Sequence, residues 1–425
     1  MAEAFDPAAV QRRTLRLLFV TQIVGGIGVA VGLSVGALLA ADMAGIGVSG
    51  LAQSAVVVGG ALFAVPATSI VLRYGRRPSL AAGYFVAALG AMLVVIAAVR
   101  GSVPLLFVAF FLFGGASTAG FQARYAAVDL APAALRGRHL ALIVWGTTIG
   151  AVAGPNLAAV AGAALDQYGI PTLAGPFFFS ALLFGLAAIG LMLLLRPDPA
   201  VVARGAGVSP LPKGEGTKGV RTGMRAALRA VVARPAASLG VSAMAAGHLV
   251  MVGVMAMTPV HIRSAGHDAA HTLRIVGVVL SFHIAGMYAF SPVIGWLTDK
   301  LGRRPMILTG VVLLLAVCAF AGNSGHDATR LAIGLTVLGL GWSATMVAGS
   351  TLLSESVPDE LRTSAQGLSD LIMGLAGAAA GALSGLVVHG WGYPTLTLLA
   401  ALATAPLVVL VTFAWASQRA ALRAG

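Results

Sequence analysis

Long apolar runs, separated by short charged or glycine-containing segments, dominate the pattern of the chain. A helix needs roughly 20 apolar residues to cross a bilayer, and twelve runs are about that long, the ninth being the shortest. Their approximate limits are 15–40, 48–72, 79–99, 104–128, 139–163, 173–195, 238–260, 273–298, 306–321, 331–353, 367–388 and 395–416. We therefore predict an all-α membrane protein with twelve transmembrane helices.

Two pairs of segments indicate an internal duplication. The charged segment Gly295–Pro305 has a partial counterpart 227 residues earlier, which includes Arg73, Gly75, Arg76 and Arg77. Similarly, the segment 355–363 matches 129–137 at an offset of 226 residues. Two matches at nearly one offset predict two pseudo-symmetric six-helix bundles, 1–195 and 238–425, joined by a linker, 196–237.

Composition excludes a soluble domain, because 58% of the residues are hydrophobic and only 10% are charged. The net charge of +13 is explained by where the Lys and Arg residues lie relative to the membrane. If the amino terminus is cytoplasmic, 22 of the 27 Lys and Arg residues lie in cytoplasmic segments and four lie outside. This predicts cytoplasmic termini and no nucleic-acid partner, in a multi-pass protein of the bacterial cytoplasmic membrane.

The linker is rich in Gly, Pro, Lys and Arg, so we expect it to be flexible. Its last part carries Arg221, Arg225 and Arg229 at four-residue spacing, with Met224, Leu228 and Val231 on another side. Two interpretations remain open: a basic amphipathic helix lying on the inner leaflet, or a solvated tether held near anionic lipid by charge.

With these features the chain resembles the major facilitator superfamily. The resemblance covers everything outside the linker, and it implies two helical bundles that rock around a central cavity. In the second half the family's loop motif is complete, with Gly295, Asp299, Lys300, Gly302, Arg303 and Arg304. In the first half Arg73, Gly75, Arg76 and Arg77 match, whereas Thr68 replaces the glycine and Leu72 replaces the acid. We expect Gly75 and Gly302 to permit tight reversals, and the arginines to hold carboxylates or lipid phosphates.

Two further motifs fit the same family. Gly146, Gly150, Gly154 and Pro155 resemble the fifth-span motif of its drug/proton antiporters, in which glycines four apart admit a close helix and the proline kinks the span. The second motif places an acid seven residues before an arginine, at Asp129 and Arg136 and again at Glu355 and Arg362. We expect each acid and arginine to close an ion pair that breaks as the bundles rock.

A charged side chain inside a transmembrane span raises the free energy of inserting that span into the bilayer, so each one is a functional candidate. Arg124 has either a transport role or a structural ion pair with Asp129. Asp370 either pairs with Arg73, Arg76 or Arg77 or carries the proton. The histidines of the seventh and eighth spans, His248 and His283, are further proton candidates, because an imidazole changes charge near neutral pH.

The remaining polar and thioether side chains in the spans are candidates for the substrate cavity, each with helix packing as its alternative role. They are Gln22, Gln53, Gln122, Asn156, Met251, Met255 and Tyr288. Met and His together suit copper, but no carboxylate or thiol joins them, so we expect no metal site.

The sequence lacks a nucleotide-binding loop and a zinc-hydrolase motif, so we expect neither a cofactor nor an enzyme. The favoured function is proton-coupled efflux of amphipathic or lipophilic small molecules by alternating access. Import of a metabolite by a symporter or uniporter is the alternative, and a non-transporting membrane sensor is an alternative of another class. Protons, a small-molecule substrate and membrane lipids are the expected partners of a functional monomer.

Overall fold

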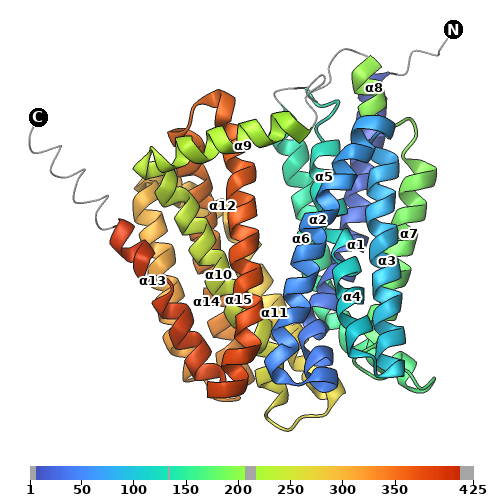
Figure 1. Ribbon diagram of the computed structural model, residues 1–425, viewed down its shortest axis with the longest axis vertical. Coiled ribbons are helices and arrows are strands. Elements are labelled where there is room, and N and C mark those ends of the chain that lie inside the picture. The colour runs from blue at the N-terminus through green and yellow to red at the C-terminus, as the bar shows by residue number, and fades with distance from the viewer. Residues whose placement is uncertain (1–5, 133–134, 206–216, 412–425) are drawn as a thin grey trace, which may run out of the picture. The chain divides into compact units, whose positions relative to one another are not determined.

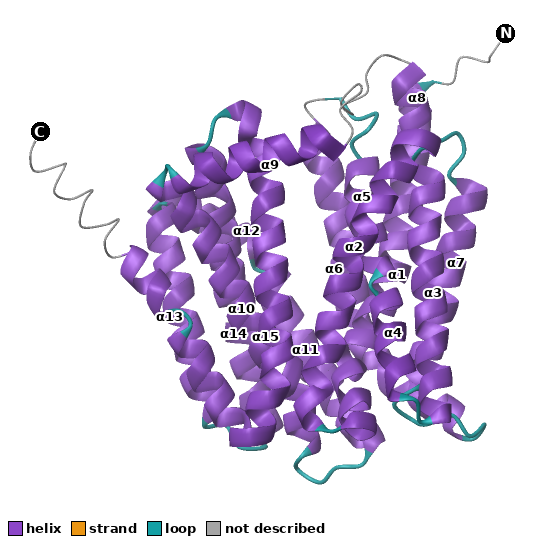
Figure 2. Ribbon diagram, in the orientation of Figure 1, coloured by secondary structure: helices purple, strands orange, loops and turns teal. Residues whose placement is uncertain are grey.

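The computed structural model describes residues 6–132, 135–205 and 217–411, and helices make up almost all of them (Figures 1 and 2). Nearly continuous helix is what a bilayer requires, since backbone groups in lipid must be hydrogen-bonded within the chain. The helices are α1 Pro7–Ala44, α2 Ile46–Tyr74, α3 Arg76–Arg100, α4 Val103–Phe113, α5 Gly115–Ala126, α6 Arg136–Asp166, α7 Gly175–Leu194, α8 Pro199–Gly205, α9 Thr217–Val232, α10 Pro235–Arg263, α11 Ala269–Tyr288, α12 Ser291–Leu301, α13 Arg303–Gly322, α14 Ala328–Ser356 and α15 Asp359–Leu402.

Within the described residues, eleven helical segments are long and apolar enough to cross a membrane. The last of them, Ser364–Val411, has 48 residues, so as one straight helix it would be about 70 Å long and more than twice the thickness of a bilayer core. Gly392 interrupts it with a φ of 81°, and Pro394 follows. This segment therefore holds both the eleventh and the twelfth predicted spans.

The described chain divides into two compact units. Unit 1 comprises Met1–Pro212 and Gly266–Ser281, and unit 2 comprises Lys213–Ala265 and Phe282–Gly425. The first part of α11 therefore packs with unit 1, although it follows the linker in the sequence.

Unit 1 is built around α1, which packs against α6 and α7. Buried rings fill the space beside it, with Phe113 lying edge-on to both Phe177 and Phe184. Gly28 and Gly32 of α1 make room for these rings, because a Cβ at either position would overlap with Phe184 or Phe113.

Unit 2 has a core of aliphatic side chains between α10, α13, α14 and the end of the chain, including Leu239, Ile307, Val311, Ala344 and Leu407. Helix α9 spans the predicted basic stretch (Figure 1), and part of its apolar side packs within unit 2. Ala227 and Val231 are buried against Val241 and Leu353 of the same unit, while Leu228 is exposed.

Candidate functional site

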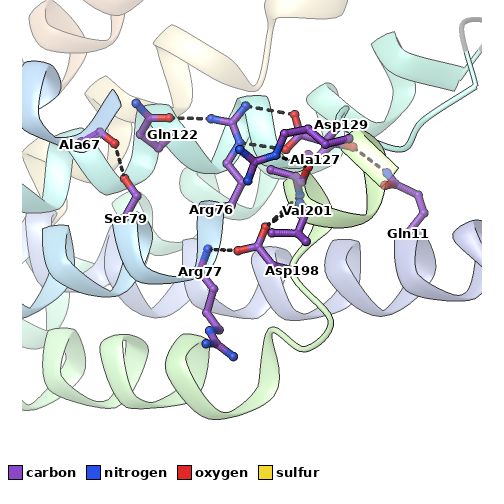
Figure 3. Close-up of polar contacts among 12 residues, drawn as sticks. Gln11, Ala67, Arg76, Arg77, Ser79, Gln122, Ala127, Asp129, Asp198 and Val201 are labelled. Atoms are coloured by element: carbon purple, nitrogen blue, oxygen red, sulfur yellow. Dashed lines mark hydrogen bonds and ion pairs between the residues drawn. The ribbon is translucent and has the colours of Figure 1, made fainter. Parts of the chain in front are cut away.

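A buried ion pair lies at the reversal between α2 and α3 of unit 1. Gly75 alone separates the two helices and has a φ of 98°, so the predicted tight reversal is present. Arg76 Nε donates to Asp129 Oδ2 at 2.8 Å, and Nη2 donates to Oδ1 at 3.0 Å (Figure 3). The two side chains are only 5% and 2% exposed. A bidentate arginine–carboxylate ion pair of this kind is among the strongest polar contacts that a protein makes.

Gln122 of α5 completes this site. Its Oε1 accepts a hydrogen bond of 2.7 Å from Arg76 Nη1 (Figure 3). Its Nε2 donates at 3.5 Å to Thr68 Oγ1. Thr68 is one of the two departures from the family's loop motif. The amide therefore provides Arg76 with an acceptor in the half where Leu72 has replaced the acid.

An equivalent but more exposed pair lies between α12 and α13 of unit 2. Gly302 has a φ of 97°, and Arg303 donates to both oxygens of Glu355, from Nε at 3.1 Å and from Nη2 at 2.8 Å. Asp299 adds a second carboxylate, 3.3 Å from Arg303 Nη2. Here Arg303 is 27%, Glu355 51% and Asp299 75% exposed.

Each pair joins an arginine of the loop motif to the acid of the acid–arginine motif. Asp129 pairs with Arg76 and not with Arg124, so the second of the two alternatives for Arg124, an ion pair with Asp129, is not what the structure shows. Arg124 lies over the ring of Phe121 at 5.1 Å, and within the described parts of the chain its buried Nε has no hydrogen-bond partner.

The expected pairing of each acid with the arginine seven residues later is also not what the structure shows for Glu355. Glu355 binds Arg303, while Arg362 Nε donates to the carbonyl oxygen of Ser354 at 2.9 Å. Asp129 likewise binds Arg76, and the side chain of Arg136 lies outside the described residues.

Three side chains beside the buried pair were not selected from the sequence. Gln11 Nε2 donates to the carbonyl oxygen of Ala127 at 2.7 Å, at the end of α5. Asp198 accepts the backbone N–H of Arg77 at 2.7 Å (Figure 3). Arg204 donates to the carbonyl oxygen of Leu72 at 2.7 Å. These contacts involve backbone atoms of distant segments, which no spacing of residue types reveals.

The other loop residues differ in their surroundings. Lys300 Nζ lies 4.8 Å from the centre of the Trp296 ring, and Gly295 has no neighbour within 4 Å of a built Cβ. Arg73 is exposed, Arg77 is half-buried, and Arg304 has a polar or ring contact of its own.

The predicted glycine face of the fifth span packs closely against α1. A Cβ on Gly150 would overlap with the carbonyl oxygen of Ile23, and one on Gly154 would lie 2.7 Å from the carbonyl oxygen of Ile27. Pro155 lies inside α6, and Asn156 Nδ2 donates to Ser281 Oγ at 2.6 Å. These contacts all lie within unit 1.

Trp342, which was not a predicted site residue, contacts two predicted residues of unit 2, His248 and Tyr288. Trp342 Nε1 of α14 donates to His248 Nδ1 of α10 at 3.2 Å, and Tyr288 of α11 packs edge-on to the Trp342 ring at 5.9 Å. His248 and Tyr288 are half-buried, while Trp342 is buried. We call these three residues the aromatic cluster.

The other candidates of unit 2 have less in common. His283 is 0% exposed, with Nδ1 against the carbonyl oxygen of Leu335 at 2.8 Å and no partner for Nε2 in the described chain. Met251 is buried and Met255 is half-buried on α10. Asp370 is exposed on α15.

The first-half glutamines Gln22 and Gln53 lie in different surroundings. Gln22 is buried, where Nε2 donates to Tyr84 Oη at 3.3 Å and Oε1 accepts from Thr147 Oγ1 at 3.0 Å. Gln53 borders a cavity of about 10 Å³ beside Phe110 and Phe113, which has room for one water. The helix-packing alternative therefore describes Gln22 in this structure.

Comparisons with known proteins agree with this architecture. The sequence profile of the Major Facilitator Superfamily matches residues 18–282 and 266–423. The chain is 38% identical over 407 residues to the uncharacterized MFS-type transporter YdeG of Bacillus subtilis, an alignment that covers 95% of this chain and 92% of the relative. It is also 28% identical over 419 residues to the riboflavin transporter RfnT of Brucella anthropi, covering 95% of each chain.

Among solved structures, the nucleoside transporter NupG superposes with a TM-score of 0.71 at 15% sequence identity, over 96% of this chain and 98% of NupG. That likeness concerns the fold alone. The sequence matches, the many membrane-spanning helices and this shared fold establish a multi-pass, non-enzymatic transport protein of the cell membrane. The chain belongs to the Major Facilitator Superfamily.

Proposed function

We propose that this protein is a proton-coupled antiporter that exports amphipathic or lipophilic small molecules by alternating access, as a monomer with both termini in the cytoplasm. The observation that carries the proton coupling is the hydrogen bond between Trp342 and His248. Family membership supports transport over the sensor alternative.

His248 is suited to carry the proton because its protonation changes a contact between helices. Trp342 Nε1 can only donate, so His248 Nδ1 accepts, and the neutral ring carries its hydrogen on Nε2. A second proton on Nδ1 removes the acceptor and breaks the bond between α10 and α14. Protonation therefore alters the packing of these two helices, as a coupled transporter requires.

His283 is less suited to this role. Its Nδ1 donates to a carbonyl oxygen, so a proton would have to be added at Nε2, which is fully buried and has no partner among the described residues. A charge there would be neither solvated nor paired, which is strongly unfavourable. We assign His283 to the packing of α11 against α14.

The two arginine–carboxylate pairs support a gating role for the loops. Arg303, Asp299 and Glu355 are partly exposed and form bonds that exchange readily with water, whereas the Arg76 site is buried. We propose that the second-half loop changes partners during transport and that the first-half loop stays fixed. Asp370 is retained as a gating candidate with Arg73 or Arg77, because the guanidinium of Arg76 already binds Asp129 and Gln122.

Two half-buried side chains of unit 2 support the substrate class: Met255 of α10 and Tyr288 of the aromatic cluster. They offer deformable and aromatic contacts with few fixed polar groups, which suits lipophilic molecules with flat rings. The fifth-span glycine motif favours export. The similarity to the riboflavin transporter RfnT supports a second candidate, the import of a flat heterocyclic metabolite.

Flux measurements in proteoliposomes distinguish the candidates. The purified protein is reconstituted, a pH gradient of either sign is imposed, and the movement of ethidium and of riboflavin is followed by fluorescence. Uphill movement of ethidium against the inward flow of protons supports the antiporter. Riboflavin accumulation together with protons supports import, and flux that ignores the gradient would refute proton coupling.

A further inference from the structure

The first residues of the central linker, Asp198–Gly205, are bound to the first-half loop. The carboxylate of Asp198 accepts hydrogen bonds from the first turns of two helices, α3 and α8 (Figure 3). Its Oδ2 accepts the N–H of Arg77 in the first turn of α3, at 2.7 Å, and its Oδ1 accepts the N–H groups of Ala200 and Val201 in α8, at 2.9 and 3.3 Å. A carboxylate is favourable at a helix N-terminus, where backbone N–H groups are unpaired and the dipole is positive.

The backbone of the loop is shaped to admit this carboxylate. A Cβ built on Gly75 would overlap with Asp198 Oδ2. The equivalent glycine, Gly302, has the same backbone conformation, but only Pro305 Cδ lies near its Cβ position, at 3.7 Å. Gly75 is therefore required both for its φ and for the space, whereas Gly302 is required for its φ alone.

Two further contacts fix α8 in place. Arg204 Nη1 donates to the carbonyl oxygen of Leu72 at 2.7 Å, near the end of α2, where carbonyl groups lack helical partners. Ala203 is buried against Val10 of α1 and Leu130. The segment Asp198–Gly205, which we call the linker head, therefore contacts both sides of the loop and the segment that carries Asp129.

These contacts coincide with the position where the first half departs from the motif. Leu72 corresponds to Asp299, whose carboxylate lies 3.3 Å from Arg303 Nη2 at the start of α13. Neither α3 nor α13 has an acidic residue in its own first turn. In addition to the carboxylates of Asp129 and Glu355, each of these helices begins beside one further carboxylate, which comes from within the loop in the second half and from the linker in the first.

We propose that Asp198 is a positioning residue that replaces the missing acid of the first-half loop, and that Arg204 holds it there. With the loop fixed, Arg76 stays within reach of Asp129 and Gln122. This inference rests on the proposed gating role of the loops. It makes the linker head a structural part of the first-half loop, while the second-half loop depends only on its own acid.

Labelling of matched reporter cysteines tests the proposal. Cys318 is the only cysteine, so Cys318→Ala gives a background for Tyr74→Cys and Leu301→Cys, which are equivalent loop positions that are 66% and 53% exposed. Maleimide labelling rates are measured on the full chain in proteoliposomes. Asp198→Asn should raise the rate at position 74 by about tenfold, because a charge-assisted hydrogen bond is lost, and should leave position 301 unchanged.

Asp299→Asn is the matched control and should raise the rate at position 301 alone. The decisive variant restores the acid of the motif: Leu72→Asp, at a position that is 40% exposed, should return the Asp198→Asn protein to the parent labelling rate at position 74. A carboxylate that only capped α8 would not be replaced in this way.

Arg204→Gln provides a second route if Asp198→Asn does not fold, since it removes an exposed contact and should also raise labelling at position 74 alone. The proposal is overturned if both reporters change equally, if neither changes, or if Leu72→Asp does not restore the rate. None of these rates depends on a substrate or a proton gradient, so they are independent of the flux measurements.

Discussion

At the scale of single residues, equivalent ion pairs differ chiefly in their exposure to solvent. In both Arg76–Asp129 and Arg303–Glu355 the arginine donates from Nε and Nη2. The two partners are also separated by nearly the same number of residues in each pair. Removing one partner of a buried pair leaves an uncompensated charge, whereas an exposed pair contributes little to stability. The energetic cost of a substitution should therefore differ between the halves.

This difference gives a stability prediction. Asp129→Asn should lower the free energy of unfolding by about 3–5 kcal/mol, because the Arg76 guanidinium is left buried without its counter-charge. The matched change Glu355→Gln should cost less than about 1 kcal/mol. Denaturant unfolding in mixed micelles measures both, and equal losses would show that burial does not distinguish the two pairs.

The sequence identified most of these residues but not their partners. The loop glycines and arginines could be read from spacing, because a φ near 100° restricts the residue type and clustered arginines interrupt the apolar runs at the ends of spans. Asp129 lies 53 residues from Arg76, and its nearer neighbour Arg124 looked equally suitable. Trp342 was missed because an aromatic side chain in an apolar run carries no sign that its N–H binds a histidine.

At the scale of helices, the hydrophobic runs predicted where the spans lie, since each must cross the same thickness of lipid. The runs could not predict how the linker folds. Its composition favours flexibility, yet α8 packs on unit 1 and α9 packs on unit 2 through small buried residues such as Ala203 and Ala227. The spacing of arginines indicated a helix near α9, but alanines occur throughout the linker, so their positions do not show which of them are buried against a unit.

A cut in the linker should therefore leave both helices in place. If a protease site is inserted between α8 and α9 and cleaved in the folded protein, α8 should remain protected from further proteolysis with unit 1 and α9 with unit 2. Mass spectrometry of the limit fragments checks this. Trimming of either helix back to its neighbouring span would contradict the packing described for it.

The contact between α1 and α6 gives a second prediction at this scale. Gly150→Val should destabilise the protein by about 1–3 kcal/mol, because its Cβ would enter the space of the Ile23 carbonyl group. Gly190→Val on α7 is the matched control, since no atom lies within 4 Å of a Cβ built there, and it should be close to neutral. Thermal unfolding of both variants in one detergent is the measurement.

At the scale of the whole molecule, membership of the superfamily establishes a transporter, while the direction of transport and its driving ion remain proposals. The two units share local features at the predicted repeat positions: Gly75 and Gly302 both have a positive φ, and Arg76 and Arg303 each bind a carboxylate. The pseudo-symmetry of the two bundles stays a prediction. The substrate cannot be read in the same way, because apolar and thioether side chains accept many shapes.

The central claim is that protons drive transport through His248. The most direct measurement compares two fluxes of the transported compound in His248→Gln proteoliposomes, one driven by a pH gradient and one exchanging labelled for unlabelled compound without a gradient. We predict that gradient-driven flux falls to the level of protein-free liposomes while exchange continues. Gradient-driven flux that persists in this variant would contradict the claim.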